Sequence, residues 1–205
     1  MGVEGTRARK EKMQKRKLRD LEVSTIGVGC MGFSHGYGKV PETEYSINAM
    51  RKAFDAGCNF FDTAEVYGDV VFYPGHNEEL VGKALGSVRN NVVLATKLHL
   101  RPDEVAASPS VYDAVKAHLV ASMKRLGTDY VDLYYLHRIN EDVSFEEVAA
   151  AMGRLIDEGL IRGWGLSQVD VDTLAKAHAV TPVSAVQNIY SMLERLRSRG
   201  DSVLR

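Results

Sequence analysis

Short apolar runs alternate with segments of helical hydrophobic period from about Leu21 onward, and this alternation occurs six times. Such an order is typical of α/β folds built from repeated strand-helix units. The runs are almost continuously apolar, which predicts a sheet buried on both faces. We expect its strands near residues 24–29, 59–63, 92–97, 130–136, 161–166 and 184–189.

The segments between the runs carry apolar stripes at the spacing of an amphipathic helix. The clearest stripe extends over residues 145–156, and Gly159 is placed to end that helix. Similar stripes occupy residues 80–88 and 111–126. With 205 residues, of which 45% are hydrophobic, the chain can bury the core of one domain. Two architectures fit this pattern, an open doubly wound sheet and a closed eight-stranded barrel.

The segment Gly27–Gly32 fits the G-x-G-x-x-G pattern of dinucleotide-binding sheets. In those sheets a helix begins inside the motif, so that its N-terminus meets the pyrophosphate. Here residues 33–41 contain two further glycines and a proline, and the next helix is expected only near Glu42. We therefore interpret these glycines as a strand end followed by a mobile loop over a site.

Four polar side chains stand at or just beyond the ends of separate apolar runs: Asp62, Tyr67, Lys97 and His137. The C-terminal ends of parallel strands lie on one face of a sheet or barrel, so these residues are expected to converge there. Taken singly, each has a plainer interpretation, in which Asp62 caps a turn, Lys97 pairs with a nearby acid and the two rings pack. Taken together, the four favour a catalytic site.

In one cleft these side chains could deliver a proton to a carbonyl oxygen. A free tyrosine titrates at about 10, and an ammonium close to a phenol oxygen stabilises the phenolate. Lys97 could supply the ammonium, Asp62 could hold it protonated, and His137 could donate a hydrogen bond to the substrate. None of the four is an evident nucleophile toward the carbonyl carbon, and a hydride from a nicotinamide cofactor would fill that gap.

Several ordered motifs resemble those of the aldo-keto reductase family. They are Phe61–Gly68 at the second strand, Asn77–Leu85 in the helix after it, Thr96-Lys97, Leu136-His137, Gly165–Ser167 and Val186-Gln187. The likeness extends from about Met13 to Glu194 and covers roughly the first six of eight strand-helix units. It implies an α/β fold, a TIM barrel of the (β/α)₈ type that is truncated at the C-terminus after about strand 6.

The resemblance also implies an NADP-dependent oxidoreductase that reduces aldehydes or ketones, with NADPH as the expected cofactor and NADH as the other option. It makes Tyr67 the proton donor, gives Asp62 and Lys97 the task of tuning it, and lets His137 orient the carbonyl. The residues implied in cofactor binding are Gly29, Cys30, Met31, Asp62, Ser167, Gln168 and Gln187. Those implied in the substrate pocket are Met31, Phe33, Tyr67 and His137.

Two departures from the family pattern bear on this expectation. Gln168 stands where the family usually has asparagine, a change that would loosen the hold on the nicotinamide carboxamide. After Gln187 the chain offers neither a strand run nor a good helical stripe, although an eight-stranded barrel needs two more units. We expect either a truncated product or completion by a second chain, and exposed sheet edges would then invite self-association.

Composition and charge limit the other classes of function. A net charge of −1 argues against a nucleic-acid partner, and the absence of a long apolar run argues against a membrane span or signal peptide, so a cytoplasmic location is expected. Cys30 and Cys58 stand at no metal-ligand spacing, and no metal is expected. We divide the chain into a disordered extension (1–12), the barrel domain (13–194) and an irregular tail (195–205).

Two other hypotheses stay open on the sequence. The chain could be a catalytically inactive fragment, or a non-catalytic relative that keeps the fold's residues without tight cofactor binding. Lys97 could instead form a Schiff base with a carbonyl substrate, as in an aldolase. That chemistry needs a neutral amine, which a neighbouring Asp62 would disfavour.

Overall fold

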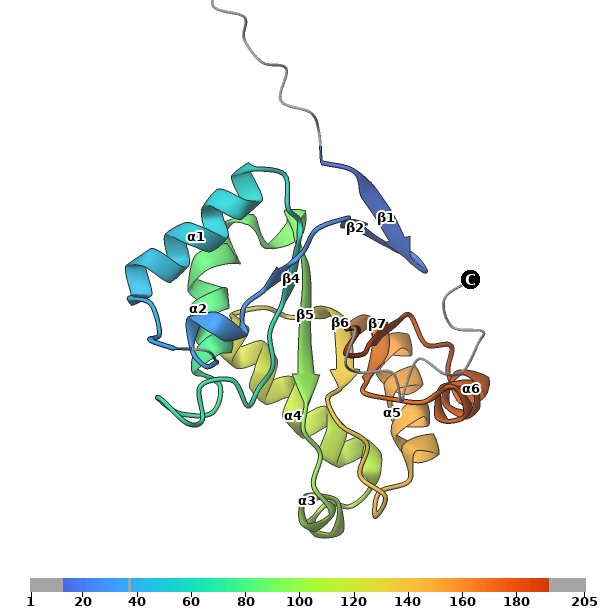
Figure 1. Ribbon diagram of the computed structural model, residues 1–205. Coiled ribbons are helices and arrows are strands. Elements are labelled where there is room, and N and C mark those ends of the chain that lie inside the picture. The colour runs from blue at the N-terminus through green and yellow to red at the C-terminus, as the bar shows by residue number, and fades with distance from the viewer. Residues whose placement is uncertain (1–12, 37, 192–205) are drawn as a thin grey trace, which may run out of the picture.

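Six parallel strands form the main sheet, and their order in space is their order in the chain. The computed structural model describes residues 13–36 and 38–191. A doubly wound sheet reverses its strand order at a switch point, whereas a barrel of strand-helix units does not. The unbroken order therefore decides for the barrel type, as a curled sheet of six strands (Figure 1). The strands are β3 (Val28–Gly29), β4 (Phe60–Asp62), β5 (Val93–Leu98), β6 (Val131–Leu136), β7 (Ile161–Ser167) and β8 (Ala185–Gln187).

Helices connect successive strands and pack side by side along the outside of the sheet (Figure 1). The stripes predicted over residues 111–126 and 145–156 form two of them, and the stripe over 80–88 is shared between a helix and a 3₁₀ segment. The helices are α1 (Thr43–Asp55), α2 (His76–Leu85), α3 (Pro102–Ala107), α4 (Val111–Leu126), α5 (Phe145–Asp157) and α6 (Val171–Val180), with 3₁₀ segments η1 (Met31–Phe33) and η2 (Gly86–Asn91).

The prediction of one continuous strand over residues 24–29 is wrong. That segment divides between β3 and β2 (Leu21–Ser24), and β2 pairs antiparallel with β1 (Lys15–Leu18) in a hairpin. The turn passes through Arg19, whose φ of 52° lies in the left-handed region. Lys15, Arg16 and Lys17 are exposed, so β1 has no apolar alternation by which the sequence could have revealed it.

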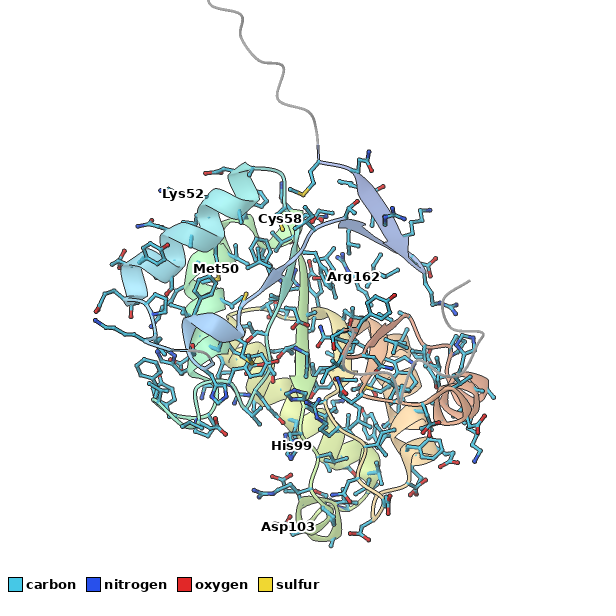
Figure 2. All side chains as sticks on the ribbon, viewed as in Figure 1. Met50, Lys52, Cys58, His99, Asp103 and Arg162 are labelled. Carbon is cyan, nitrogen blue, oxygen red and sulfur yellow. The ribbon has the colours of Figure 1, made fainter. Side chains whose placement is uncertain are left out.

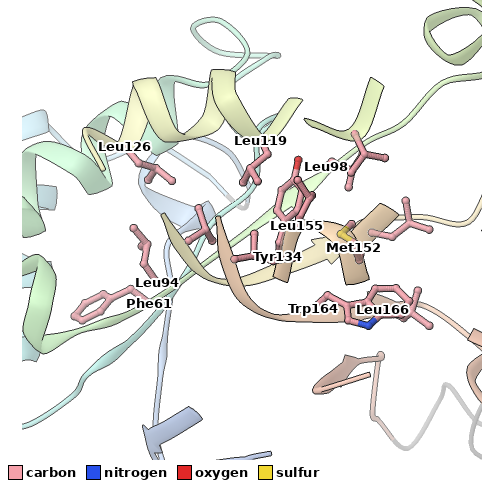
Figure 3. Close-up of a cluster of buried hydrophobic side chains, with 14 of the residues drawn as sticks. Phe61, Leu94, Leu98, Leu119, Leu126, Tyr134, Met152, Leu155, Trp164 and Leu166 are labelled. Atoms are coloured by element: carbon pink, nitrogen blue, oxygen red, sulfur yellow. The ribbon is translucent and has the colours of Figure 1, made fainter. Parts of the chain in front are cut away.

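The core has two layers, one on each face of the sheet. The outer layer lies between strands and helices, and Figure 3 shows Phe61, Leu94, Tyr134 and Trp164 in it with side chains of α4 and α5. The inner layer consists of Leu21 and Val23 of the hairpin with Val93, Ala95, Leu133 and Tyr135. Every residue of β5 and β6 is buried, which accounts for their near-continuous apolar sequence.

The predicted extension (1–12) and tail (195–205) lie outside the described residues, so both remain predictions. Within the described part of the chain, no helix is both long enough and apolar enough to cross a membrane.

A buried carboxylate ties the N-terminal ends of three strands together. Asp132 is fully buried in β6, and its Oδ2 accepts from the Leu94 backbone N–H at 2.9 Å and pairs with Arg89 at 2.7 Å. Arg162 lies 3.0 Å from Oδ1 as an ion pair without hydrogen-bond geometry. Both guanidinium groups also lie over the ring of Tyr130, at 4.0 and 4.4 Å from its centre. Figure 2 shows Arg162 far from His99, which follows β5 at its other end.

The two arginines should differ in their contribution to stability. The Arg89 side chain is 12% exposed and that of Arg162 is 57% exposed. We expect Arg89→Ala to lower the free energy of unfolding by about 3 kcal/mol, because it leaves the buried carboxylate of Asp132 without its largely buried ion-pair partner. Arg162→Ala should cost less than about 1 kcal/mol. Urea unfolding of both variants measures the difference, and equal losses would contradict this account.

Candidate active site

Asp62, Lys97, His137, Ser167 and Gln187 lie at the C-terminal ends of five different strands. Asp62, Ser167 and Gln187 are the last residues of β4, β7 and β8, Lys97 is the last but one of β5, and His137 directly follows β6. Because all five strands are parallel, these positions lie at the same end of the sheet. The register places Asp62 beside Ala95 and Lys97 beside Tyr135.

The ammonium of Lys97 is fully buried and uses its donors within the site. Nζ donates to the carboxylate of Asp62, to the backbone carbonyl of Thr63 at 2.7 Å and to the phenol oxygen of Tyr67 at 3.3 Å. A lysine has three N–H donors, so each has an acceptor. A buried charge is tolerated only with such pairing, and the structure thereby brings three of the four predicted residues into direct contact.

The carboxyl of Asp62 is under two opposing influences. Burial raises its pKa, while the Lys97 ammonium, and more weakly the amide of Gln187, favour the ionised form. One oxygen contacts Lys97. The other, Oδ2, is buried and makes no hydrogen bond of normal geometry within the described residues. This oxygen can therefore still accept a hydrogen bond of normal geometry from a bound molecule.

His137 joins the site through ring contacts. Its ring lies edge-on to Tyr67, with 5.7 Å between centroids, and edge-on to His99 at 6.3 Å. Burial lowers the pKa of His137 to about 3, assisted by the charges of Lys97 and Arg138. The imidazole is therefore neutral near pH 7, with one N–H donor. Its Nδ1 is buried without a hydrogen-bond partner in the described part of the chain.

Asn77 holds the loop between β4 and α2 that carries Tyr67. Its backbone N–H donates to the carbonyl of Tyr67 at 3.2 Å, and its Oδ1 accepts from the Thr63 hydroxyl at 2.6 Å. Its Nδ2 donates to the carbonyl of Cys30 at 2.9 Å and to the Ser34 hydroxyl at 2.8 Å. Asn77 is fully buried, so these bonds are shielded from water. The Tyr67 loop is thus fixed to the glycine-rich segment.

No α-helix begins inside the glycine-rich segment Gly27–Gly32. The three-residue 3₁₀ helix η1 follows Cys30, and the next α-helix starts at Thr43, which confirms the expected helix start near Glu42. The Cys30 thiol is fully buried, and burial raises its pKa, while its backbone N–H donates to the Asp62 carbonyl at 2.8 Å. Gly29 has open space where a side chain would point. This leaves room for a bound group beside Asp62.

The predicted pocket residues Met31 and Phe33 are only half-buried. Phe33 packs against the outer core layer, and the methyl group of Met31 lies near Gly36. Neither has a described contact with Tyr67 or His137. Their assignment to a substrate pocket therefore stays a prediction.

Arg138, which the sequence interpretation missed, links two candidate residues. Its guanidinium donates to the carbonyl of His137 at 2.6 Å and to the Ser167 hydroxyl at 3.1 Å. Gln168 has a φ of 60°, in the left-handed region, and its backbone N–H donates to the carbonyl of Gln187 at 3.2 Å. The ends of β6, β7 and β8 are thereby joined. In the sequence, the only indication of this role of Arg138 is its position directly after His137 at the end of a predicted strand.

The described residues contain no group of three or more His, Cys, Asp or Glu side chains arranged to hold a metal ion.

The backbone of Gln168 gives a test of local strain. Asparagine tolerates the left-handed region better than glutamine does, so we expect Gln168→Asn to raise the free energy of unfolding by about 0.5 kcal/mol. Gln168→Ala, which removes the side chain without gaining that tolerance, is the control and should not be stabilised. Urea unfolding measures both, and a destabilised asparagine variant would contradict the expectation.

The lowered pKa of His137 has a consequence for stability in acid. Below about 6.5 the unfolded chain binds a proton at this imidazole, whereas the folded chain binds it only near 3. The contribution of His137 to stability is therefore complete above about 6.5 and is lost as the pH falls through this window. We expect His137→Gln to flatten this part of the stability curve, measured by urea unfolding at a series of pH values. His35→Gln serves as the control, and an unchanged slope in His137→Gln would refute the expectation.

The comparisons with known proteins agree with this geometry. The model of the aldo/keto reductase family matches residues 25–201. An aldo-keto reductase of Strobilurus tenacellus is 38% identical over 183 residues, which make up 86% of this chain and 52% of the relative. A relative from Glycine max shares 38% identity over 181 residues, 85% of this chain and 50% of its own. The chain thus spans about half the length of the curated relatives it matches.

Solved structures show the same fold. A thermostable aldo-keto reductase in complex with the inhibitor epalrestat has a TM-score of 0.76 and 30% identity, over 89% of this chain and 65% of that one. An aldo-keto reductase of Klebsiella pneumoniae in complex with NADPH has a TM-score of 0.70 and 31% identity, over 87% and 58%. The resemblance inferred from the sequence motifs is confirmed, and the chain belongs to the aldo/keto reductase family.

Proposed function

We propose that the described site serves the NADPH-dependent reduction of an aldehyde or ketone to an alcohol, with Tyr67 as the proton donor. The observation that carries the proposal is the buried ammonium of Lys97, shared between the carboxylate of Asp62 and the phenol oxygen of Tyr67. NADH remains the other candidate cofactor. The substrate is a small carbonyl compound.

The proton leaves Tyr67 as the carbonyl oxygen gains negative charge. The ammonium of Lys97, 3.3 Å from the phenol oxygen, stabilises the charge that the departing proton leaves behind. Asp62 keeps that ammonium protonated and directs it, since both groups are held on adjacent strands. Because Lys97 is charged and paired, it is a poor Schiff-base nucleophile, which disfavours the aldolase alternative.

The neutral imidazole of His137 orients the carbonyl. A neutral ring donates one hydrogen bond without competing with Tyr67 for the role of acid. Its edge-on contact with the Tyr67 ring supports a common role for the two side chains. A carbonyl oxygen between them would accept one bond from each, which fixes its direction before proton transfer.

The residues at the strand ends fit a nicotinamide nucleotide. The unpaired Oδ2 of Asp62 suits a ribose hydroxyl donor, and the open space at Gly29 leaves room for that sugar. Ser167, Gln168 and Gln187 would hold the carboxamide, and Cys30 and Met31 would border the ribose. When bound, the cofactor supplies the hydride to the carbonyl carbon. The NADPH complex of the Klebsiella pneumoniae relative supports the choice of cofactor.

Replacing the phenol tests the proposed acid. We expect Tyr67→Phe to lower kcat for carbonyl reduction by about 100-fold or more, because the proton donor is lost. Its Kd for NADPH, from fluorescence titration, should change by less than about twofold, since the ring stays. The matched control is Tyr45→Phe, which removes an exposed phenol on α1. Unchanged turnover in Tyr67→Phe would refute the role.

The same titration tests the second hypothesis, that of a catalytically inactive fragment or a non-catalytic relative. Folded wild-type chain that binds no NADPH would support the inactive alternative. Micromolar binding together with NADPH oxidation by an aldehyde would exclude it.

A further inference from the structure

Glu65 lies two residues before Tyr67 and bonds twice to the end of β5. Its backbone N–H donates to the carbonyl of Lys97 at 3.2 Å, and its Oε1 accepts from the backbone N–H of His99 at 2.5 Å. Thr63 makes the preceding bond of this series, to the carbonyl of Ala95 at 2.9 Å. The carboxylate thus extends the pairing of β4 with β5 beyond the last residue of either strand.

His118 of α4 holds that carboxylate from the outer side. Its Nδ1 lies 2.8 Å from Oε2 of Glu65, and its Nε2 lies 3.4 Å from Oε2 of Glu104 in α3. Glu65 is buried, and the His118 side chain is only 19% exposed. Both oxygens of Glu65 are therefore occupied, one by the end of β5 and the other by a helix that packs behind it.

We propose that Glu65 and His118 form a positioning pair that sets the loop carrying Tyr67 against the end of β5, and hence sets the phenol against the Lys97 ammonium. The inference rests on the proposed function, because it assigns the pair a part in the proton transfer. Neither residue contacts Tyr67 or Lys97 through its side chain in the described structure. Their effect passes through the backbone bonds of residues 63–67 and 97–99.

The charges around His118 give the pair a dependence on pH. The hydrogen bond to Glu65 raises the pKa of His118, with a further contribution from Glu104. Arg101, Asp69, His99 and Arg125 line the same surface cavity of 590 Å³, together with Glu65, Glu104 and His118, from the β4–α2 and β5–α3 loops and from α3 and α4. Protonated His118 can donate to both carboxylates at once.

The direction of this dependence follows from the raised pKa of His118. The charged pair is complete below about 6.5, the ordinary pKa of a histidine, and is lost as the pH rises through the raised value. A neutral His118 keeps one N–H donor for two carboxylates. At a pH above the pKa of His118, the bond from His118 to Glu65 is therefore weaker, and Glu65 is held less firmly against the His99 amide at the end of β5.

Hydrogen exchange of the His99 backbone amide measures the pair without any need for turnover. We expect His118→Gln to accelerate exchange at His99 by about tenfold after correction for the intrinsic rate, and Glu65→Gln to do the same. In the wild type, the same acceleration should develop as the pH rises through the titration of His118. The amide of Thr173, which donates to the Asp170 carboxylate at 2.8 Å, is the control and should not change.

Steady-state kinetics test the link to catalysis. We expect His118→Gln to lower kcat by about fivefold or more with KM within about twofold. We also expect kcat of the wild type to decline as the pH rises through the titration of His118, and this decline to be absent in His118→Gln. Glu158→Gln, which removes an exposed carboxylate on the helix surface, should leave both parameters and the pH profile unchanged.

Each outcome has a distinct meaning. If exchange at His99 is the same in the wild type and both variants, the positioning pair is refuted, whatever the activity. If exchange changes but kcat and its pH profile do not, the pair is structural and the inference also fails. If the wild type has no turnover, the proposed function fails, and exchange at the Tyr67 amide then decides whether the pair holds that loop. Should Glu65→Gln not fold, His118→Gln alone decides.

Discussion

The burial of one ammonium group constrains the whole site. An unpaired lysine charge inside a protein is costly, and Lys97 is fully buried. It is kept there by acceptors from the last residue of β4, from the backbone next to it and from the loop that follows. These acceptors come from one stretch of chain, residues 62–67, which must therefore run close along the end of β5. The positions of Asp62 and Tyr67 follow from that requirement.

The sheet supplies rigidity at one end and exposes functional groups at the other. At the N-terminal ends of the strands, Asp132 and Arg89 join neighbouring strands through a shielded ion pair. At the C-terminal ends, polar side chains and loop bonds replace apolar packing, and Oδ2 of Asp62 and Nδ1 of His137 are buried there without a hydrogen bond of normal geometry in the described structure. A parallel sheet in chain order makes this division possible, because every strand begins at one end and finishes at the other.

The strand ends could be predicted from the sequence because each one follows an apolar run. Because the strands are parallel, their C-terminal ends lie at the same edge of the sheet. Asp62, Lys97 and His137 were found in this way, and all lie where that pattern places them. The β1–β2 hairpin could not be found, since its exposed lysines hide the strand. Glu65, His118 and Arg138 were missed for another reason. Their partners are far away in the chain, and spacing along a sequence does not give the direction of a side chain.

The two unpaired atoms, Oδ2 of Asp62 and Nδ1 of His137, also affect the thermodynamics of the empty fold. A buried polar atom without a partner costs about 1 to 3 kcal/mol relative to the same atom in water. The unfolded chain does not carry this cost, so the empty site lowers the free energy that separates folded from unfolded molecules. A molecule that pairs these atoms binds the folded state alone, and mass action then turns its concentration into added stability. The stability of the fold therefore depends on the concentration of the ligand that the site binds.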